Sequence, residues 1–389
     1  MRRILIGLLL ASSLLGFSQD KLLTIQDAIR GFQLYPKGLY DVQWLPGGQW
    51  FSQLTISESG QTIEVQEISV TKGRNISVSL DDINASLAED TKLKRLPRAN
   101  WISDKEFQFM SNSQGYAYHI EKKSIRLLTY KNTFNVNTPQ LFSDGTGYVA
   151  ETEKGLAFDF NGNSAEIKSD IDGIVIGKTV HRSEFGISGG LFPSPSHALL
   201  AYYEMDERMV TQYPLYKLAD TPATTNMIRY PTAGANSHHV HVKIKDLRNV
   251  SDAITIKTTG DPEQYLTNVS WSADEKYVLI ALVNRAQNHM WLNKYDAKSG
   301  AFIKTLFEET NERYVEPEHA AIFLPNDPSK FIWWSERDGY NHLYLYDIEG
   351  KLIKQLTKGE WIVTEYVGMS SDAKKLYIVG TKDSPLERH

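Results

Sequence analysis

Short stretches of alternating apolar and polar residues recur along most of this chain. Four of them, residues 266–271, 277–284, 289–296 and 301–308, follow one another with a polar turn after each. Alternation with a period of two, interrupted by Gly, Ser, Asn and Asp, is typical of short antiparallel strands. The segment therefore predicts four strands in about 43 residues, which is the length of one β-propeller blade.

The same pattern follows directly in residues 320–357. The apolar stretches are AAIFLP, FIWWSE, HLYLYD and LIKQLT, and they are separated by the turns NDPSK, RDGYN and IEGK. A single four-stranded sheet of this kind cannot bury both of its faces, so such units stack radially around an axis.

A recurring marker identifies further units. An aromatic or apolar residue closes the inner strand, a turn rich in Ser, Pro, Asp or Gly follows, and then comes an apolar strand. From residue 39 onward we therefore predict an all-β fold, a propeller with six full four-stranded blades and two strands of a seventh. The markers are Trp44, Trp101, Phe142, Phe192, Trp271, Phe323 and Met369.

Two parts of the predicted propeller depart from the regular pattern. The widest gap between markers contains an insertion at about residues 204–236, rich in Thr, Pro, Tyr and Asn, and long insertions on a rigid scaffold often carry function. The last unit has only two predicted strands, in residues 365–369 and 376–381. Because an incomplete blade leaves unpaired strand edges, we expect the sequence to be part of a longer polypeptide.

The N-terminus has the pattern of an export signal. Arg2 and Arg3 precede an apolar run at residues 4–15, and residues 16–18 are small enough for a cleavage site. We therefore predict a signal peptide at residues 1–18 and an exported protein, periplasmic or secreted. The apolar run is too short to span a bilayer, which needs about 20 residues.

Residues 19–38 are predicted to form a leader segment before the propeller. Thr24 and Asp27 have the spacing of a helix-capping pattern, and residues 25–32 could form two helical turns. Pro36 would end this helix.

Composition limits the function classes. With 389 residues, 41% hydrophobic and 23% charged, the chain is typical of soluble globular proteins. A net charge of −5 and the lack of any basic block argue against a nucleic-acid partner. The chain has no cysteine, which excludes disulfides, thiolate metal sites and a cysteine nucleophile.

Two local motifs suggest chemistry but favour structural roles. Residues 186–190 fit the nucleophile pattern G-x-S-x-G, but two prolines and no helical period follow, so we interpret them as a loop. His238, His239 and His241 resemble metal ligands, but no carboxylate or cysteine at a suitable spacing completes a site. We therefore predict a structural role for these histidines and no bound metal or cofactor.

Aromatic side chains recur at strand spacing near the end of the chain. We predict that they pack between blades rather than forming a platform for bases or sugars. They are Trp333, Trp334, Tyr340, Tyr344 and Tyr346.

Several segments together resemble the bacterial dipeptidyl peptidase IV family, exported serine peptidases of the prolyl oligopeptidase superfamily. The resemblance is dense from about residue 180 onward and weak before it. The segments are VHRSEFGI, MVTQYPL, RYPTAGANSHHVHV, YLTNVSWSADE, NRAQNHMWLN, YVEPEH, SERDGYNHLYLYD, LTKGEW and SPLERH.

This resemblance implies an eight-bladed propeller followed by an α/β-hydrolase domain with a Ser-Asp-His triad. It implies removal of X-Pro or X-Ala dipeptides from peptides with a free N-terminus, and it is compatible with a homodimer. The present chain would hold most of the propeller, lack the final blade and the catalytic domain, and be inactive by itself.

The resemblance also implies a site on the propeller. An acidic pair in the family holds the substrate's free α-amino group, because a carboxylate in a partly desolvated cleft pairs well with an ammonium ion. Glu184 falls on the second acidic position, whereas the first is Ser183, whose neutral hydroxyl can only accept a hydrogen bond from the ammonium ion. A carbonyl-binding arginine of the family has no matching motif here, and nearby Arg126 stays unassigned.

Two alternatives remain open from the sequence. One is a non-catalytic exported propeller that binds protein or peptide partners, since blade arrays often act only as binding surfaces. The other is a tripeptidyl peptidase of the same superfamily.

Overall fold

The computed structural model describes residues 24–30, 39–57, 60–67, 75–370 and 372–389. The predicted signal peptide at residues 1–18 lies outside this range. The predicted leader helix is present as α2 (Ile25–Arg30), and its capping pattern is confirmed. The Thr24 hydroxyl accepts a hydrogen bond from the Asp27 N–H at 3.0 Å, and Asp27 Oδ2 accepts one from the Thr24 N–H at 3.0 Å.

The first three sheets follow one another along the chain, each an antiparallel sheet in which every strand pairs with its sequence neighbour. They are β1 (Tyr40–Trp44), β2 (Trp50–Ser57), β3 (Gly60–Glu67) and β4 (Asn75–Ser79); β5 (Asn100–Trp101), β6 (Glu106–Ser111), β7 (Gln114–His119) and β8 (Ser124–Lys131); and β9 (Gln140–Leu141), β10 (Gly147–Glu151), β11 (Gly155–Phe160) and β12 (Asn163–Lys168).

The fourth sheet has an interrupted inner edge. Its strands are β13 (Ile174–Ile176), β14 (Leu191–Pro193), β15 (Leu199–Asp206), β18 (His239–Asp246) and β19 (Ile254–Thr255). Both β13 and β14 pair with β15, so together they occupy the place of one strand. The chain between them, residues 177–190, leaves the sheet as a loop.

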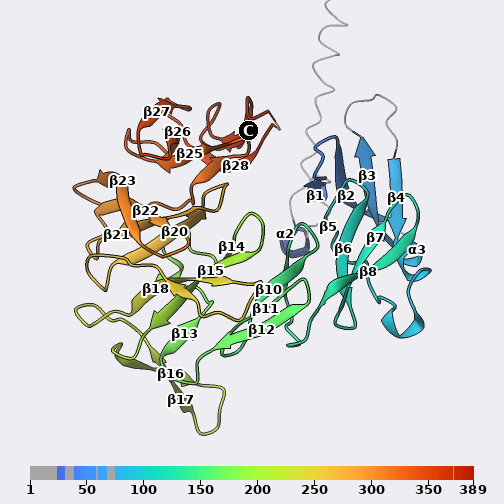
Figure 1. Cartoon of the computed structure of the whole chain (residues 1–389), viewed down its shortest axis with the longest axis horizontal. Helices are drawn as coiled ribbons and strands as arrows, with labels where there is room; N and C mark the ends of the chain where they lie inside the picture. The colour runs from blue at the N-terminus through green and yellow to red at the C-terminus, as the bar shows by residue number, and fades with distance from the viewer. Residues whose placement is uncertain (1–23, 31–38, 58–59, 68–74, 371) are drawn as a thin grey trace, which may run out of the picture.

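Two more four-stranded sheets and a two-stranded one complete the described chain. Figure 1 shows the sheets in chain order around an arc, with β1 at one end and β28 at the other. The strands are β20 (Tyr265–Trp271), β21 (Tyr277–Val283), β22 (His289–Asp296) and β23 (Phe302–Thr310); β24 (Ile322–Leu324), β25 (Asp327–Ser335), β26 (His342–Asp347) and β27 (Leu352–Gln355); and β28 (Val363–Met369) and β29 (Leu376–Gly380).

This arrangement confirms the predicted propeller of six full blades and part of a seventh. All seven sequence markers lie in or directly after the inner strand of a sheet, at β1, β5, β9, β14, β20, β24 and β28. The boundaries differ in detail. Strand β25 begins at Asp327, so most of the predicted turn NDPSK belongs to the strand.

The hydrophobic core is divided among the interfaces between neighbouring blades. Each of six buried clusters joins one sheet to the next, as in a radial stack and unlike the single interface of a β-sandwich. Because side chains alternate along a strand, Trp333 packs toward the fifth blade and Trp334 toward the seventh.

The aromatic prediction is confirmed except at one residue. Trp333, Tyr344 and Tyr346 pack between the fifth and sixth blades, and Trp334 between the sixth and seventh. Tyr340 is 36% exposed, and the prediction was wrong for it because it lies in the turn between β25 and β26.

The sequence did not predict a helix after the first sheet or a β-hairpin within the insertion. A short helix, α3 (Leu80–Asn84), follows β4, and Ser79 and Asp82 cap it reciprocally; the 3₁₀ turn η2 (Glu89–Thr91) comes next. The predicted insertion contains a β-hairpin, β16 (Gln212–Lys217) and β17 (Thr224–Arg229), which projects away from the blades in Figure 1.

Candidate functional site

The loop between β13 and β14 carries both predicted site residues. It begins with the 3₁₀ turn η3 (His181–Ser183), and Glu184 follows directly. The N–H of Ser183 donates to the Val180 carbonyl at 3.0 Å, and the N–H of Glu184 donates to the His181 carbonyl at 3.1 Å. The turn therefore presents two neighbouring exposed side chains, Ser183 and Glu184, on a hydrogen-bonded backbone.

The backbone of this turn is unusual. His181, Arg182 and Ser183 have φ values of 50°, 58° and 63°, and Phe185 has 54°. Positive φ is uncommon for residues other than glycine and persists where the surroundings hold it in place. The surroundings of this turn must therefore supply that constraint.

Two buried rings anchor the turn at its ends. The His181 ring is 3% exposed, and its Nε2 accepts a hydrogen bond at 3.1 Å from the N–H of Leu266 in β20. The Phe185 ring is buried between the fifth and sixth blades, 5.0 Å from the Tyr265 ring in an edge-to-face contact. The Phe185 carbonyl accepts a hydrogen bond from the Thr267 hydroxyl at 2.9 Å.

The carboxylate of Glu184 has one side-chain partner. Its Oε2 accepts a hydrogen bond at 2.8 Å from Nε2 of Gln287, in the turn between β21 and β22. The same Gln287 nitrogen donates to the Tyr265 hydroxyl at 3.1 Å, and Arg285 also donates to that hydroxyl. Among the described residues no other side chain bonds the Glu184 carboxylate, so Oε1 is available to a ligand.

A cavity of about 460 Å³ lies next to this loop, lined by residues between 308 and 319 and between 334 and 341. The Val315 N–H donates to the Gln287 carbonyl at 2.8 Å, which joins the cavity wall to the partner of Glu184. Gly186, at φ +71°, lies so close that an added Cβ would be 1.9 Å from the Glu318 carbonyl oxygen. The cavity and the Glu184 loop are therefore in direct contact.

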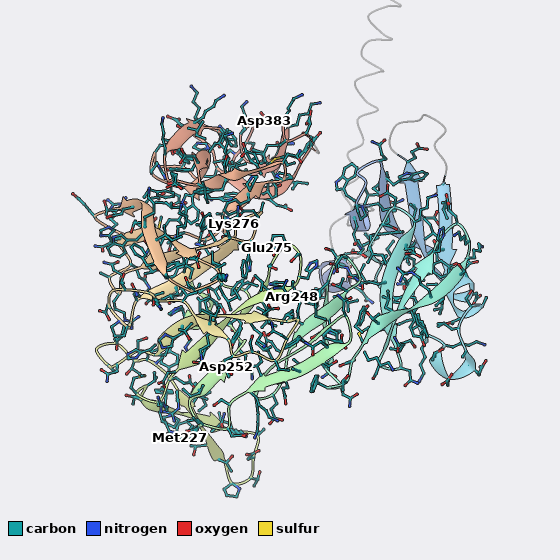
Figure 2. The ribbon with its side chains drawn as sticks, viewed as in Figure 1. Met227, Arg248, Asp252, Glu275, Lys276 and Asp383 are labelled. Atoms are coloured by element: carbon teal, nitrogen blue, oxygen red, sulfur yellow. The ribbon has the colours of Figure 1, made fainter. Side chains whose placement is uncertain are left out.

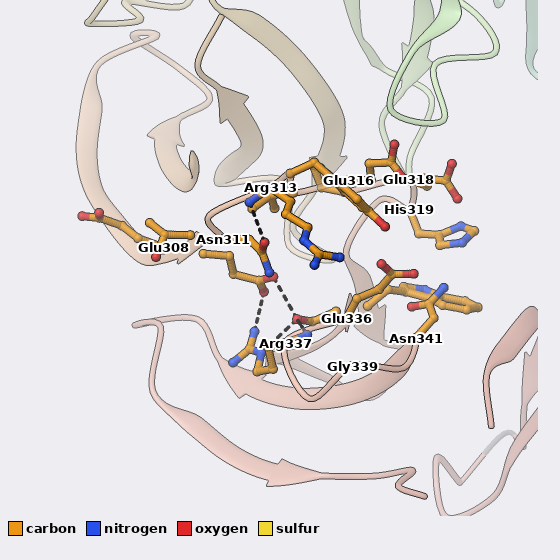
Figure 3. A pocket seen from close by; sticks show the side chains of 17 residues that line it. Glu308, Asn311, Arg313, Glu316, Glu318, His319, Glu336, Arg337, Gly339 and Asn341 are labelled. Carbon is orange, nitrogen blue, oxygen red and sulfur yellow. Dashed lines mark hydrogen bonds and ion pairs between the residues drawn. The ribbon is translucent and has the colours of Figure 1, made fainter. Parts of the chain in front are cut away.

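The cavity is predominantly acidic. Figure 3 shows Glu316 and Glu318 on one wall and Glu336 on the other. Burial, together with the negative charges of Glu316 and Glu318, raises the pKa of Glu336. Of the two arginines in the lining, Arg337 pairs with Glu309 at 2.5 Å, which leaves Arg313 against these three glutamates. The cavity therefore favours a cationic or hydrogen-bond-donating ligand.

The remaining sequence candidates have structural surroundings. Ser188 of the G-x-S-x-G pattern lies in the loop before β14 with no helix after it, which confirms the interpretation as a loop. His238 is buried, and its Nε2 lies 3.0 Å from Nδ1 of His181, which confirms a structural role for it. Arg126 pairs with Glu106 at 2.9 Å on the second blade, and the structure gives it no role in the site.

His239 and His241 lie in β18, where His239 is half-buried and His241 exposed. In the part of the chain that the structure describes, no group of three or more His, Cys, Asp or Glu side chains could hold a metal ion. None of the described helices has the length and apolar composition needed to cross a membrane.

Sequence reasoning missed the residues that support the loop. His181, Tyr265 and Gln287 were not selected as site residues, although each lies in a segment that carries the family resemblance. The glutamates that line the cavity were also not selected. The available signal was the presence of polar residues in the turns NRAQN and YVEPEH, which are brought together only in the folded chain.

Comparison with known proteins gives consistent matches. Residues 158–389 match the family described as the dipeptidyl peptidase IV (DPP IV) N-terminal region. The probable dipeptidyl-aminopeptidase B of Tuber melanosporum is 29% identical over 231 residues, which are 53% of this chain and 25% of that protein. A homologue of the same description from Arthroderma benhamiae is 27% identical over 215 residues, 49% of this chain and 24% of that protein.

Solved structures are similar over most of the chain. The crystal structure of a putative dipeptidyl aminopeptidase IV from Bacteroides ovatus has a TM-score of 0.78 and 33% identity, covering 89% of this chain and 50% of that one. Dipeptidyl peptidase 4 of Porphyromonas gingivalis, at 20% identity and a TM-score of 0.73, shares the fold over 95% of this chain and 54% of its own. The chain thus spans about half the length of these two proteins and matches about a quarter of the curated relatives.

Proposed function

Because the chain belongs to the dipeptidyl peptidase IV family, through its N-terminal region, we propose that it is the propeller of an exported serine exopeptidase. The enzyme removes X-Pro or X-Ala dipeptides from peptide N-termini. The propeller controls access to the active site and anchors the substrate's α-amino group. The nucleophile, base and oxyanion hole belong to a C-terminal α/β-hydrolase domain, so the present chain alone has no peptidase activity.

The observation that carries this proposal is the setting of Glu184. Its carboxylate is exposed, oriented by Gln287 through Oε2, and mounted on a turn fixed by two buried rings. An ammonium group has three N–H donors, and it can donate to Glu184 Oε1 and to the neighbouring Ser183 hydroxyl. A group held in this way is positioned for reaction without further loss of orientational freedom.

The acidic cavity beside Glu184 supports the same proposal. The carboxylates of Glu316, Glu318 and Glu336 produce a negative potential that attracts the cationic N-terminus of a peptide. An N-acetylated peptide has no such charge. The proposed site therefore selects for a free N-terminus, which is the property of an exopeptidase.

Export to the periplasm or the medium is part of the proposal. It is supported by the charged start and the apolar run of the first eighteen residues, which lie outside the described structure. Detection of the mature protein in a periplasmic or culture fraction, with an N-terminus at Gln19, would test it. Retention of residues 1–18 on protein from the cytoplasm would contradict it.

The test of the function uses the polypeptide that includes the hydrolase domain. Glu184→Gln should lower kcat/KM for a Gly-Pro chromogenic substrate about ten- to one-hundred-fold, because a hydrogen bond to a charged group contributes about 1.5–3 kcal/mol. Glu153→Gln, at an exposed glutamate of the β10–β11 turn, is the matched control and should have no effect.

The outcomes separate the alternatives. Unchanged kinetics in Glu184→Gln would reject the amino-group anchor. Cleavage of Ala-Ala-Pro but not Gly-Pro substrates would indicate a tripeptidyl peptidase. If the unmodified polypeptide releases no chromophore from either substrate, the peptidase proposal fails in favour of a binding propeller.

We also propose a homodimer in which the β16–β17 hairpin contacts a second copy. The hairpin projects from the fourth blade, as Met227 in Figure 2 shows, and carries several exposed apolar side chains. Exposed apolar patches of this kind commonly mark protein–protein contacts. The side chains are Tyr213, Leu215, Tyr216, Leu218 and Met227.

Sedimentation of two variants tests the dimer. Tyr216→Ser combined with Leu218→Ser should shift the protein toward monomer. Val250→Ser, at a 94% exposed residue in the loop before β19, should not. An unmodified protein that sediments as a monomer at micromolar concentration would refute the dimer.

A further inference from the structure

The buried pair His181–His238 connects the Glu184 turn to two blades. His181 opens the turn, and His238 directly precedes β18 of the fourth blade. His238 Nε2 and His181 Nδ1 are 3.0 Å apart, and His181 Nε2 is 3.1 Å from the backbone nitrogen of Leu266 in the fifth blade. His181 and His238 are 3% and 6% exposed, so these contacts are shielded from bulk water.

The hydrogen bonds determine where the protons lie. A backbone N–H can only donate, so Nε2 of His181 accepts from Leu266 and carries no proton. A neutral imidazole then has its proton on Nδ1, which donates to Nε2 of His238. His238 must in turn carry its own proton on Nδ1. Only this combination of neutral tautomers satisfies both contacts.

A second proton on either ring breaks this arrangement. If His238 gains one, its Nε2–H faces the Nδ1–H of His181, and two donors oppose each other. If His181 gains one, its Nε2–H opposes the N–H of Leu266. In both cases a buried hydrogen bond is lost and a charge is placed on a buried ring, which is unfavourable.

The charged groups around the pair do not compensate for such a charge. Arg182 approaches from the turn itself, Arg285 from the β21–β22 turn, and His239 from β18. Glu263, in the segment before β20, is a carboxylate that favours the charged form of His238. The Tyr265 phenol ring packs on His181 at 5.0 Å.

The surroundings lower the pKa of both imidazoles. Burial, with contributions from Arg285 and Arg182, lowers the pKa of His238 to about 4. Burial, with smaller contributions from His238 and Arg285, also lowers the pKa of His181 well below its usual value. Both rings are therefore neutral at pH 7, as the hydrogen bonds require.

We propose that the His181–His238 pair is a positioning device that holds the Glu184 turn in its left-handed conformation only while both rings are neutral. This inference rests on the proposed function insofar as Glu184 binds the substrate amine. The pair itself touches no substrate. It keeps His181, Arg182 and Ser183 at positive φ, a conformation that relaxes when His181 loses its partner. Acidification therefore releases the anchor.

The first test examines the unmodified chain. Long-range ¹H–¹⁵N NMR of the imidazoles at pH 7 should show both rings neutral, with the protons on Nδ1, and a slowly exchanging Nδ1–H for His181. The assignment comes from the His238→Gln and His241→Gln variants. A proton on Nε2 of His181, or a charged ring at pH 7, would overturn the proposal.

The second test follows the turn itself. Protection of the Ser183 and Glu184 amides against hydrogen exchange should fall at least about tenfold between pH 7 and pH 4. In His238→Gln the amide oxygen can still accept from His181 but does not titrate, so the part of this transition that arises from His238 should disappear. His241→Gln, at an exposed position of the same strand, should retain it. Equal pH dependence in both variants would refute the device.

A binding measurement separates this inference from the proposed function. Calorimetry with Gly-Pro and its N-acetyl derivative should show amine-dependent binding at pH 7 that weakens on acidification, less so in His238→Gln. The unmodified protein and His238→Gln contain the same carboxylates, so the difference between their losses of affinity on acidification isolates the contribution of the histidine pair. Absence of amine-dependent binding at pH 7 refutes the proposed anchor, whereas the tautomer and exchange results alone decide the histidine proposal.

Discussion

Gly186 gives the sharpest test of how the Glu184 loop is held. A Cβ at this position would lie 1.9 Å from the Glu318 carbonyl oxygen, whereas real Cβ atoms keep at least 3.0 Å. Gly186→Ala therefore requires the two segments to separate by 3.0 − 1.9 = 1.1 Å. The φ of +71° adds a second cost, because a left-handed conformation costs residues other than glycine about 1–2 kcal/mol.

The steric overlap and the positive φ together predict a substantial loss of stability in Gly186→Ala. Forcing extra atoms into a packed region costs about 1–3 kcal/mol, so the free energy of unfolding should fall by about 2–5 kcal/mol in total. Urea unfolding followed by tryptophan fluorescence measures this directly. The hydrogen exchange of the Glu184 amide should also accelerate, because Gly186 is two residues away on the same loop.

The same loop provides the matched control. Gly189→Ala places its Cβ where no atom lies within 4 Å, so its stability should stay within about 0.5 kcal/mol of the unmodified protein. If Gly186→Ala is as stable as Gly189→Ala and leaves Glu184 exchange unchanged, the loop is not held against residue 318 as described.

Two further predictions concern the core and pH. Trp333→Ala should lower the free energy of unfolding by about 3–5 kcal/mol, because Trp333 is 1% exposed between two blades. Tyr340→Ala, in the adjacent turn, should have little effect on stability. Equal losses of stability in the two variants would contradict the blade packing. Stability should also fall as the pH decreases from 6.5 to about 4, by up to about 3 kcal/mol. In that range the unfolded state binds a proton at His238 that the folded state excludes, so stability rises with pH. The slope should be smaller in His238→Gln, and a stability independent of pH below 6.5 would contradict the assigned burial.

The blades could be predicted from sequence because both faces of most sheets are buried. Strands such as β21 are apolar throughout, and the turn after each marker repeats in chain order. Tyr340 shows the limit of this reasoning. Its aromatic ring fits the periodic pattern, but its position in a turn directs it toward solvent, and the alternation alone does not reveal which turn residues are covered.

The family resemblance located the site in the sequence, but the conformation of its turn and its long-range contacts could not be predicted. Arg182 and Ser183 have no local preference for positive φ, so the turn is imposed by contacts distant in sequence. His181 and His238 are 57 positions apart, and Glu184 and Gln287 are 103 apart. The hairpin in the insertion was missed because most residues of its two strands are exposed, so no apolar alternation marks them in the sequence.

The Glu184 segment is connected to three blades at once. Val180 and Ile187 insert into the core between the fourth and fifth blades, and Phe185 inserts into the core between the fifth and sixth. Between these anchors the chain is short, and its positive φ values are held jointly by the neighbouring cores and by the His181–His238 contact. Since packed cores resist small deformations, a shift of one blade relative to another must displace the carboxylate. The position of Glu184 therefore depends on the packing between blades as much as on its own loop, so substitutions in either core can alter ligand binding without touching the ligand.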